Sequence, residues 1–110
     1  MEFTLTRKGK FCVLHLAGSS ISHEEKEDLH QTLLKLTEKE THLAINLSKL
    51  IYANSQLLSQ LLVAHRAMGK KNAVFVVIGP KGSVMDLLRI TDMIKVFKIC
   101  EGEIELDSFS

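Results

Sequence analysis

The chain has 110 residues, of which 45% are hydrophobic and 25% are charged, and its formal net charge is +1. This length supports one domain, and the small net charge argues against nucleic acid or an anionic membrane as a partner held by broad electrostatic attraction. No apolar run approaches the roughly 18 residues that a membrane-spanning helix needs, and the first ten residues lack the apolar core of a secretion signal. We therefore expect a cytoplasmic protein with a single domain over residues 1–110.

Residues 2–18 predict a β-hairpin. Phe3 and Leu5 alternate with polar residues, and the segment RKGK at 7–10 supplies a turn. The second arm, residues 11–16, is more apolar, which is typical of a strand deeper in a sheet.

Residues 22–40 change to a helical period. Ser22 followed by Glu25 is the signature of a capping box, in which each residue satisfies a backbone N–H of the other. Leu29, Leu33 and Leu36 recur at helical spacing, so we expect them to face the core.

The remaining elements alternate between strand and helix. We expect a strand at 42–47, a loop at 48–53, a helix at about 55–68 with Gly69 as its left-handed C-cap, and a strand within 72–80. A third helix at 82–90, capped by Ser83 and Asp86, and a short strand at 94–100 complete the pattern, leaving an acidic tail at 101–110. The order predicts an α/β fold with a mixed, mostly parallel sheet of about four or five strands, an N-terminal antiparallel edge strand and helices packed against the sheet.

The triplet Asn54-Ser55-Gln56 separates the third strand from a leucine-rich helix. Either Asn54 or Ser55 could cap this helix, because both side chains accept hydrogen bonds from free backbone N–H groups. In parallel α/β sheets, function gathers where strands end and helices begin. The triplet is therefore the leading candidate for a functional site.

The motifs around this triplet resemble the STAS domain, the fold of bacterial anti-sigma factor antagonists. Members of that family show a strand ending in Asp-Leu-Ser, an apolar pair, and then Asp-Ser-Ser-Gly-Leu-Gly at the start of a helix. The counterparts here are NLS, IYA and NSQLLS, followed by Gly69, AVFVVIGP and VMDLLRI, with LHLAGSSIS before the first helix. The resemblance covers about residues 3–100.

This resemblance implies a regulatory binding module without catalysis or a cofactor. It implies that Ser55 is phosphorylated by a partner serine kinase that is itself the anti-sigma factor. We expect the partner to contact Tyr52, Asn54, Ser55, Gln56 and Ser59, of which Tyr52 belongs to an apolar loop stretch that would suit an interface where it is exposed. A phosphoserine at a helix start meets free N–H groups and the positive end of the helix dipole, so the fold tolerates it while a docked partner does not.

The loop departs from the family pattern, and two alternatives follow from that. Only Ser55 and Leu58 agree among the six loop positions, and Leu57 is expected to add bulk where the kinase approaches. Asn46 also replaces the usual Asp at the strand end. One alternative is a STAS module that docks without phosphorylation. The other is a STAS subunit that binds the ATPase of a phospholipid-transport complex.

Other polar and reactive residues favour structural roles. Cys12 and Cys100 have apolar neighbours, which favours buried free thiols over a disulfide between them. His65 is expected to pack half-buried instead of acting as a base, and the sequence shows no metal-ligand spacing. STAS domains usually end in one more helix, and the ten-residue tail predicts that this helix is absent or short. Apolar surface near the last strand would then be left for a partner or for a second copy in a homodimer.

Overall fold

A computed structural model describes residues 2–18 and 22–109 of the chain. One five-stranded sheet, ordered β1-β2-β3-β4-β5, forms the centre of the molecule. β1 runs antiparallel to β2, and every other neighbouring pair is parallel, which confirms the predicted mixed sheet. The strands are β1 (Glu2–Lys8), β2 (Phe11–Gly18), β3 (His42–Leu50), β4 (Val74–Ile78) and β5 (Lys98–Cys100).

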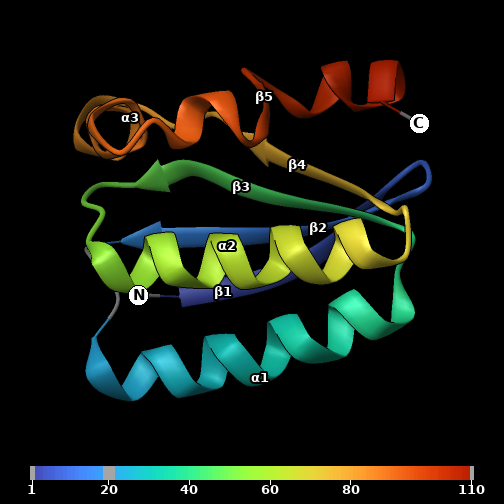
Figure 1. Cartoon of the computed structure of the whole chain (residues 1–110), viewed down its shortest axis with the longest axis horizontal. Coiled ribbons are helices and arrows are strands. Elements are labelled where there is room, and N and C mark those ends of the chain that lie inside the picture. Colours follow the sequence, from blue (N-terminus) through green and yellow to red (C-terminus); the bar gives the residue numbers. More distant parts are fainter. Residues whose placement is uncertain (1, 19–21, 110) are drawn as a thin grey trace.

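Three α-helices connect the parallel strands, and two 3-10 helices lie near the C-terminus. They are α1 (His23–Lys39), α2 (Ser55–Lys70), α3 (Gly82–Ile90), η1 (Met93–Lys95) and η2 (Glu103–Phe109). α1 and α2 run side by side in the same direction (Figure 1). Because the parallel strands follow one another in chain order, crossovers of one hand leave every connecting helix on the same face.

The core has a larger half under the α-helices and a smaller half on the opposite face of the sheet. The larger half joins buried residues of all three helices to alternate residues of the strands, including Leu14, Leu16, Leu29, Leu33, Leu43, Ile45, Leu57, Leu61, Val77, Val84 and Leu88. The smaller half contains Phe11, Val13, Ala44, Val76, Ile78, Cys100 and Leu106. Burial of Leu29, Leu33 and Leu36 confirms the predicted core face of α1.

Two of the predicted helix ends are wrong, although the capping box of Ser22 and Glu25 is confirmed. α3 begins after Lys81 and has no side-chain cap, so Ser83 and Asp86 do not form the predicted pair. Gly69 lies inside α2, which continues to Lys70, and the left-handed residue beyond the helix is Asn72, with a φ of 55°. Asparagine adopts this conformation more readily than most residues.

Two strand boundaries also differ from the prediction. β3 continues to Leu50, because Lys49 and Leu50 still pair with Ala17 and Gly18 of β2 beyond an irregularity in the register. β5 is shorter than predicted and begins at Lys98, after the turn of η1.

The C-terminal tail forms a short helix, as expected, and this helix contributes to the core. η2 packs over the sheet face that α1, α2 and α3 leave open, and its Leu106 side chain is completely buried. Ile104 and Val96 remain 83% and 40% exposed. These two side chains lie close to β5 in the sequence, and their covering by a partner or a second copy stays a prediction.

The two cysteines are buried and free, so no disulfide joins them. Burial raises the pKa of the Cys12 thiol, and burial together with the nearby Glu105 carboxylate raises that of Cys100. Both thiols therefore carry less of the reactive thiolate at neutral pH. His65 is half-buried and packs edge-on against Phe97 and Phe75, in agreement with its expected packing role.

Candidate docking site at the start of α2

The segment between β3 and α2 is fixed through its backbone, while its large side chains face solvent. The Ile51 N–H donates to the Gly18 carbonyl at 2.8 Å, and the Ser83 hydroxyl donates to the Ile51 carbonyl at 3.0 Å. The Ile51 and Tyr52 side chains are 61% and 59% exposed. Exposed apolar and aromatic side chains on a fixed backbone are well suited to contact another protein, since little loop ordering is needed on binding.

Asn54 caps α2, which resolves the choice between Asn54 and Ser55. Its side-chain oxygen accepts from the Leu57 N–H at 3.1 Å, and its carbonyl accepts from the Leu58 N–H at 3.2 Å. Ser55 is then the first residue of the helix and is exposed. The Ser55 hydroxyl forms no hydrogen bond with a described residue, and the exposure of the residue makes it accessible.

Ser59 lies one turn further along α2, on the same face as Ser55. It is exposed, and its hydroxyl donates to the Ser55 carbonyl at 3.0 Å. Tyr52, Ser55 and Ser59 therefore belong to the exposed side of this site, while Asn54 is half-buried at the cap. Gln56 is also half-buried, and its side-chain oxygen is buried with no hydrogen-bond partner among the described residues.

The structure corrects the expected effect of Leu57. This side chain is only 2% exposed and belongs to the core beneath the helices. It therefore adds no bulk to the surface around Ser55. The replacement of the motif glycine by leucine changes the packing under the site and leaves access to the serine unchanged.

The electrostatic surroundings of Ser55 favour added negative charge. The first turn of α2 contains no acidic residue. The free N–H groups of a helix start and the dipole carry partial positive charge, which here is not offset by a carboxylate of the same turn. A phosphate on Ser55 would thus be compatible with the folded helix.

Asn46 lies in β3, ahead of the docking segment, and stabilises the second half of this strand. Its side-chain oxygen accepts from the Ser48 N–H at 2.9 Å and from the Ser48 hydroxyl at 2.6 Å, while its amide donates to the Glu103 carboxylate at 3.3 Å. Asn46 thereby connects the strand that leads to the site with η2 on the opposite face. An Asp at this position could not donate to Glu103 when ionised.

Gly79 directly follows β4 and lets the chain pass close to Ser48 of β3, near the C-terminal ends of the parallel strands. Its φ is +66°, and an added Cβ would lie 2.9 Å from the Ser48 Cβ. Its N–H donates to the Cys100 carbonyl at 2.8 Å. Only glycine fits this backbone and this spacing without strain.

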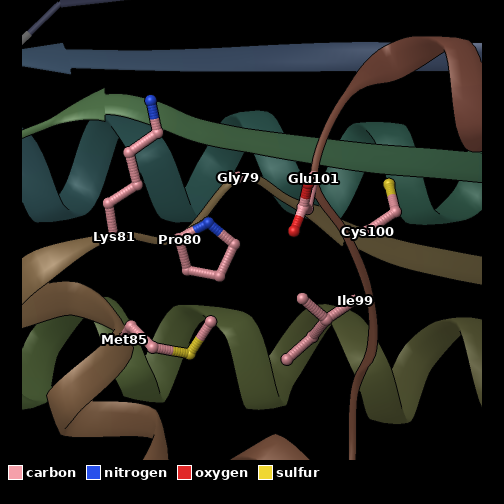
Figure 2. Close-up of a pocket in the computed structure, with 7 residues that line it drawn as sticks. All are labelled: Gly79, Pro80, Lys81, Met85, Ile99, Cys100 and Glu101. Carbon is pink, nitrogen blue, oxygen red and sulfur yellow. The ribbon is translucent and has the colours of Figure 1, made fainter.

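A pocket of about 390 Å³ lies next to Gly79, between α3 and β5. Met85 and Ile99 point toward each other across it, next to Pro80, while the Lys81 side chain extends away (Figure 2). Its lining is mainly apolar, and the only ionisable side chains among the lining residues are those of Lys81, Cys100 and Glu101.

Within residues 2–18 and 22–109, no group of three or more His, Cys, Asp or Glu side chains is placed to hold a metal ion. None of the helices in this part of the chain is long and apolar enough to cross a membrane.

Ser83 is a residue in contact with the candidate site that sequence reasoning missed. The Ser-x-x-Asp spacing favours a helix cap, and nothing in the sequence connects Ser83 with Ile51, 32 residues earlier. Its contact with the docking segment becomes visible only in the folded chain.

Comparison with protein-family models and with curated sequences gives two results. A family model described as the STAS domain matches residues 2–105. A search of curated protein sequences finds no match.

Several solved structures share the fold. An anti-sigma factor antagonist from Mycobacterium paratuberculosis has a TM-score of 0.85 and 18% identity, over 97% of this chain and 91% of that one. A STAS domain protein from Planctomyces limnophilus has a TM-score of 0.83 and 15% identity, with 96% of each chain covered. The phosphorylated form of the Bacillus cell fate determinant SpoIIAA has a TM-score of 0.78 and 14% identity, over 99% of this chain and all (100%) of that one. At such identities these likenesses establish the fold.

Proposed function

Because this chain belongs to the STAS domain family, we propose that it is a partner-switching regulator that acts like an anti-sigma factor antagonist. In this role it docks onto a serine kinase that is itself an anti-sigma factor, through the surface formed by Tyr52, Ser55 and Ser59. Phosphorylation of Ser55 then weakens the complex. The solved structures that share the fold include anti-sigma factor antagonists, one of them in a phosphorylated form.

The observation that carries this proposal is that Asn54, and not Ser55, caps α2. Asn54 supplies the helix cap, and the Ser55 hydroxyl remains exposed without a structural task. A kinase can therefore reach Ser55 without opening α2. The two negative charges added by phosphorylation would lie on the proposed docking surface, which includes the exposed Tyr52, where they oppose docking by like charge or by the cost of desolvation.

The test combines the full chain with ATP and the serine kinase of the histidine-kinase-like ATPase class from the same organism. Mass spectrometry should find one phosphate on Ser55, and none in the Ser55→Ala variant. By calorimetry, Ser55→Asp should weaken kinase binding at least tenfold, because one charge imitates part of the phosphate.

Ser59→Asp is the matched control, since it adds the same charge one helical turn away. It should weaken binding less than Ser55→Asp does. Equal kinase binding by the wild type and by Ser55→Asp would overturn the phosphorylation switch.

A second variant tests the docking surface separately from its regulation. Tyr52→Ala removes an exposed aromatic side chain and should weaken the complex while leaving the fold intact. Loss of binding in Tyr52→Ala with full binding in Ser55→Asp would indicate permanent docking. This is the behaviour expected of a STAS subunit bound to a transport ATPase.

A further inference from the structure

β1 is a long edge strand with an unpaired side. It spans seven residues, Glu2–Lys8, whereas β5 at the opposite edge spans three. Apart from the half-buried Phe3, all its residues are exposed. Edge strands usually avoid pairing by means of charged residues, prolines or bulges. The central residues of β1, Phe3 to Thr6, have none of these.

The hairpin geometry determines which backbone groups lie along this free edge. β1 and β2 are joined by a two-residue turn in which Gly9 has a φ of +58°, and Lys8 pairs with Phe11 at its base. Hydrogen-bonded and non-hydrogen-bonded pairs alternate from that closing pair onward. The N–H and C=O groups of Phe3, Leu5 and Arg7 therefore point away from β2 and are available to another strand.

We propose that β1 pairs antiparallel with β1 of a second copy of this chain about a two-fold axis at Leu5, so that two sheets join into one continuous sheet. An axis perpendicular to the sheet is the symmetry that places two identical edges side by side in antiparallel order. With this axis at Leu5, the outward-facing groups of Phe3, Leu5 and Arg7 meet outward-facing groups of the second copy along the whole strand.

The side chains of β1 are complementary to themselves in this register. Glu2 lies opposite Lys8 of the second copy, and the symmetry creates this pair twice. Thr4 lies opposite Thr6 of the second copy on the same face, and both opposite-charge and Thr–Thr pairs stabilise antiparallel strands. A register shifted by two residues would shorten the pairing and break both charge pairs.

The helix-covered face supplies an apolar contact at the axis. Leu5 pairs with Leu14 of β2, whose side chain is completely buried under the helices, yet Leu5 itself is 50% exposed. In the dimer, Leu5 would contact Leu5 of the second copy and lose part of this exposure. Arg7 is held on the same face by Glu40 at 2.9 Å, so its charge is already paired and does not oppose the association.

The first test measures self-association of the full chain by sedimentation equilibrium over a range of concentrations. The wild type should form dimers. Glu2→Lys and Lys8→Glu should each raise the dissociation constant roughly tenfold, because each converts two attractive pairs into two repulsive ones. Lys10→Glu is the control: it makes the same charge change in the exposed turn, outside the paired segment, and should leave dimerisation unchanged.

An equimolar mixture of Glu2→Lys and Lys8→Glu gives the sharpest outcome. In a mixed dimer, positions 2 and 8 that face each other again carry one lysine and one glutamate at both ends of the paired strands. The mixture should therefore dimerise about as well as the wild type, although each variant alone does not. Circular dichroism of each variant verifies that the fold is retained.

A cross-linking test fixes the register. Directly opposite residues of a hydrogen-bonded antiparallel pair have Cα atoms about 5.5 Å apart, within the range of a disulfide. Leu5→Cys should thus oxidise to a covalent dimer, whereas Thr4→Cys, which lies opposite Thr6 of the second copy, should not. A monomer at every concentration, or dimers indifferent to the charge reversals and to Leu5→Cys oxidation, would overturn the proposal.

Discussion

The hydroxyl of Ser83, in the first turn of α3, donates a hydrogen bond to the carbonyl oxygen of Ile51 at 3.0 Å. This contact joins two segments that both follow parallel strands. It fixes the backbone next to Tyr52, whose side chain we assign to the docking surface. If the proposed docking surface is correct, we expect Ser83 to affect partner binding through the position of this loop.

Ser83→Ala should weaken partner binding several-fold while lowering the free energy of unfolding by only about 1 kcal/mol or less, because the lost hydrogen bond is exposed. Calorimetry with the partner and urea denaturation measure the two effects. Ser83→Thr keeps the hydroxyl and should retain binding. A loss of stability without any loss of affinity would show that the contact serves only the fold.

The cap of α2 gives a direct comparison between adjacent residues. Asn54→Ala removes the acceptor for the Leu57 N–H and should lower the free energy of unfolding by about 1 kcal/mol. Ser55→Ala removes a hydroxyl of an exposed residue that forms no hydrogen bond with a described residue, and should change stability by less than about 0.5 kcal/mol. Urea denaturation measures the free energy of unfolding of both variants. An equal loss in the two would contradict the assignment of the cap to Asn54.

Local patterns in the sequence predicted the elements but not all of their ends. The alternation around Phe3 and Leu5 and the leucine spacing of α1 identified a hairpin and a helix correctly. Ser48 and Lys49 looked like loop residues because they are polar. They remain in β3 because pairing with β2 continues past them, and such pairing leaves no local signal.

The start of α2 was predicted correctly, but the sequence did not decide which residue caps it. The family motif located the start of α2, and either Asn54 or Ser55 satisfied the local rules for a cap. Choosing between them required the observed bond to Leu57. The role of Ser83 could not be predicted, because its spacing to Asp86 fits a cap equally well and its actual acceptor lies in a distant segment.

Asn46 explains one departure from the family pattern. Its amide donates to the Glu103 carboxylate at 3.3 Å in a partly buried setting. Asn46→Asp would replace this donor with a second carboxylate, and we expect the free energy of unfolding at pH 7 to fall by about 2 kcal/mol. The two carboxylates would repel each other across this contact, and a proton bound by one of them would relieve the repulsion. The destabilisation should therefore shrink as the pH is lowered through about 5, where one group binds a proton and can donate again.

Two variants control this prediction. Combining Asn46→Asp with Glu103→Gln restores a donor facing an acceptor and should recover most of the lost stability at pH 7. Glu103→Gln alone leaves one carboxylate fewer and should show no such pH dependence. Urea denaturation between pH 4 and pH 8 measures all three proteins. A cost for Asn46→Asp that stays constant over this range would show that repulsion from Glu103 is not its cause.

The short helix η2 packs on the sheet through Leu106, with Phe109 partly buried against the same cluster. Leu106 is completely buried in the smaller core, whereas Ile104, two residues earlier, is 83% exposed. Leu106→Ala should lower the free energy of unfolding by about 3 kcal/mol, since it leaves a cavity over the sheet. Ile104→Ala makes a similar truncation at the surface and should cost less than about 0.5 kcal/mol. Thermal and urea unfolding compare the two variants, and a small cost for Leu106→Ala would mean that η2 adds little to the stability of the domain.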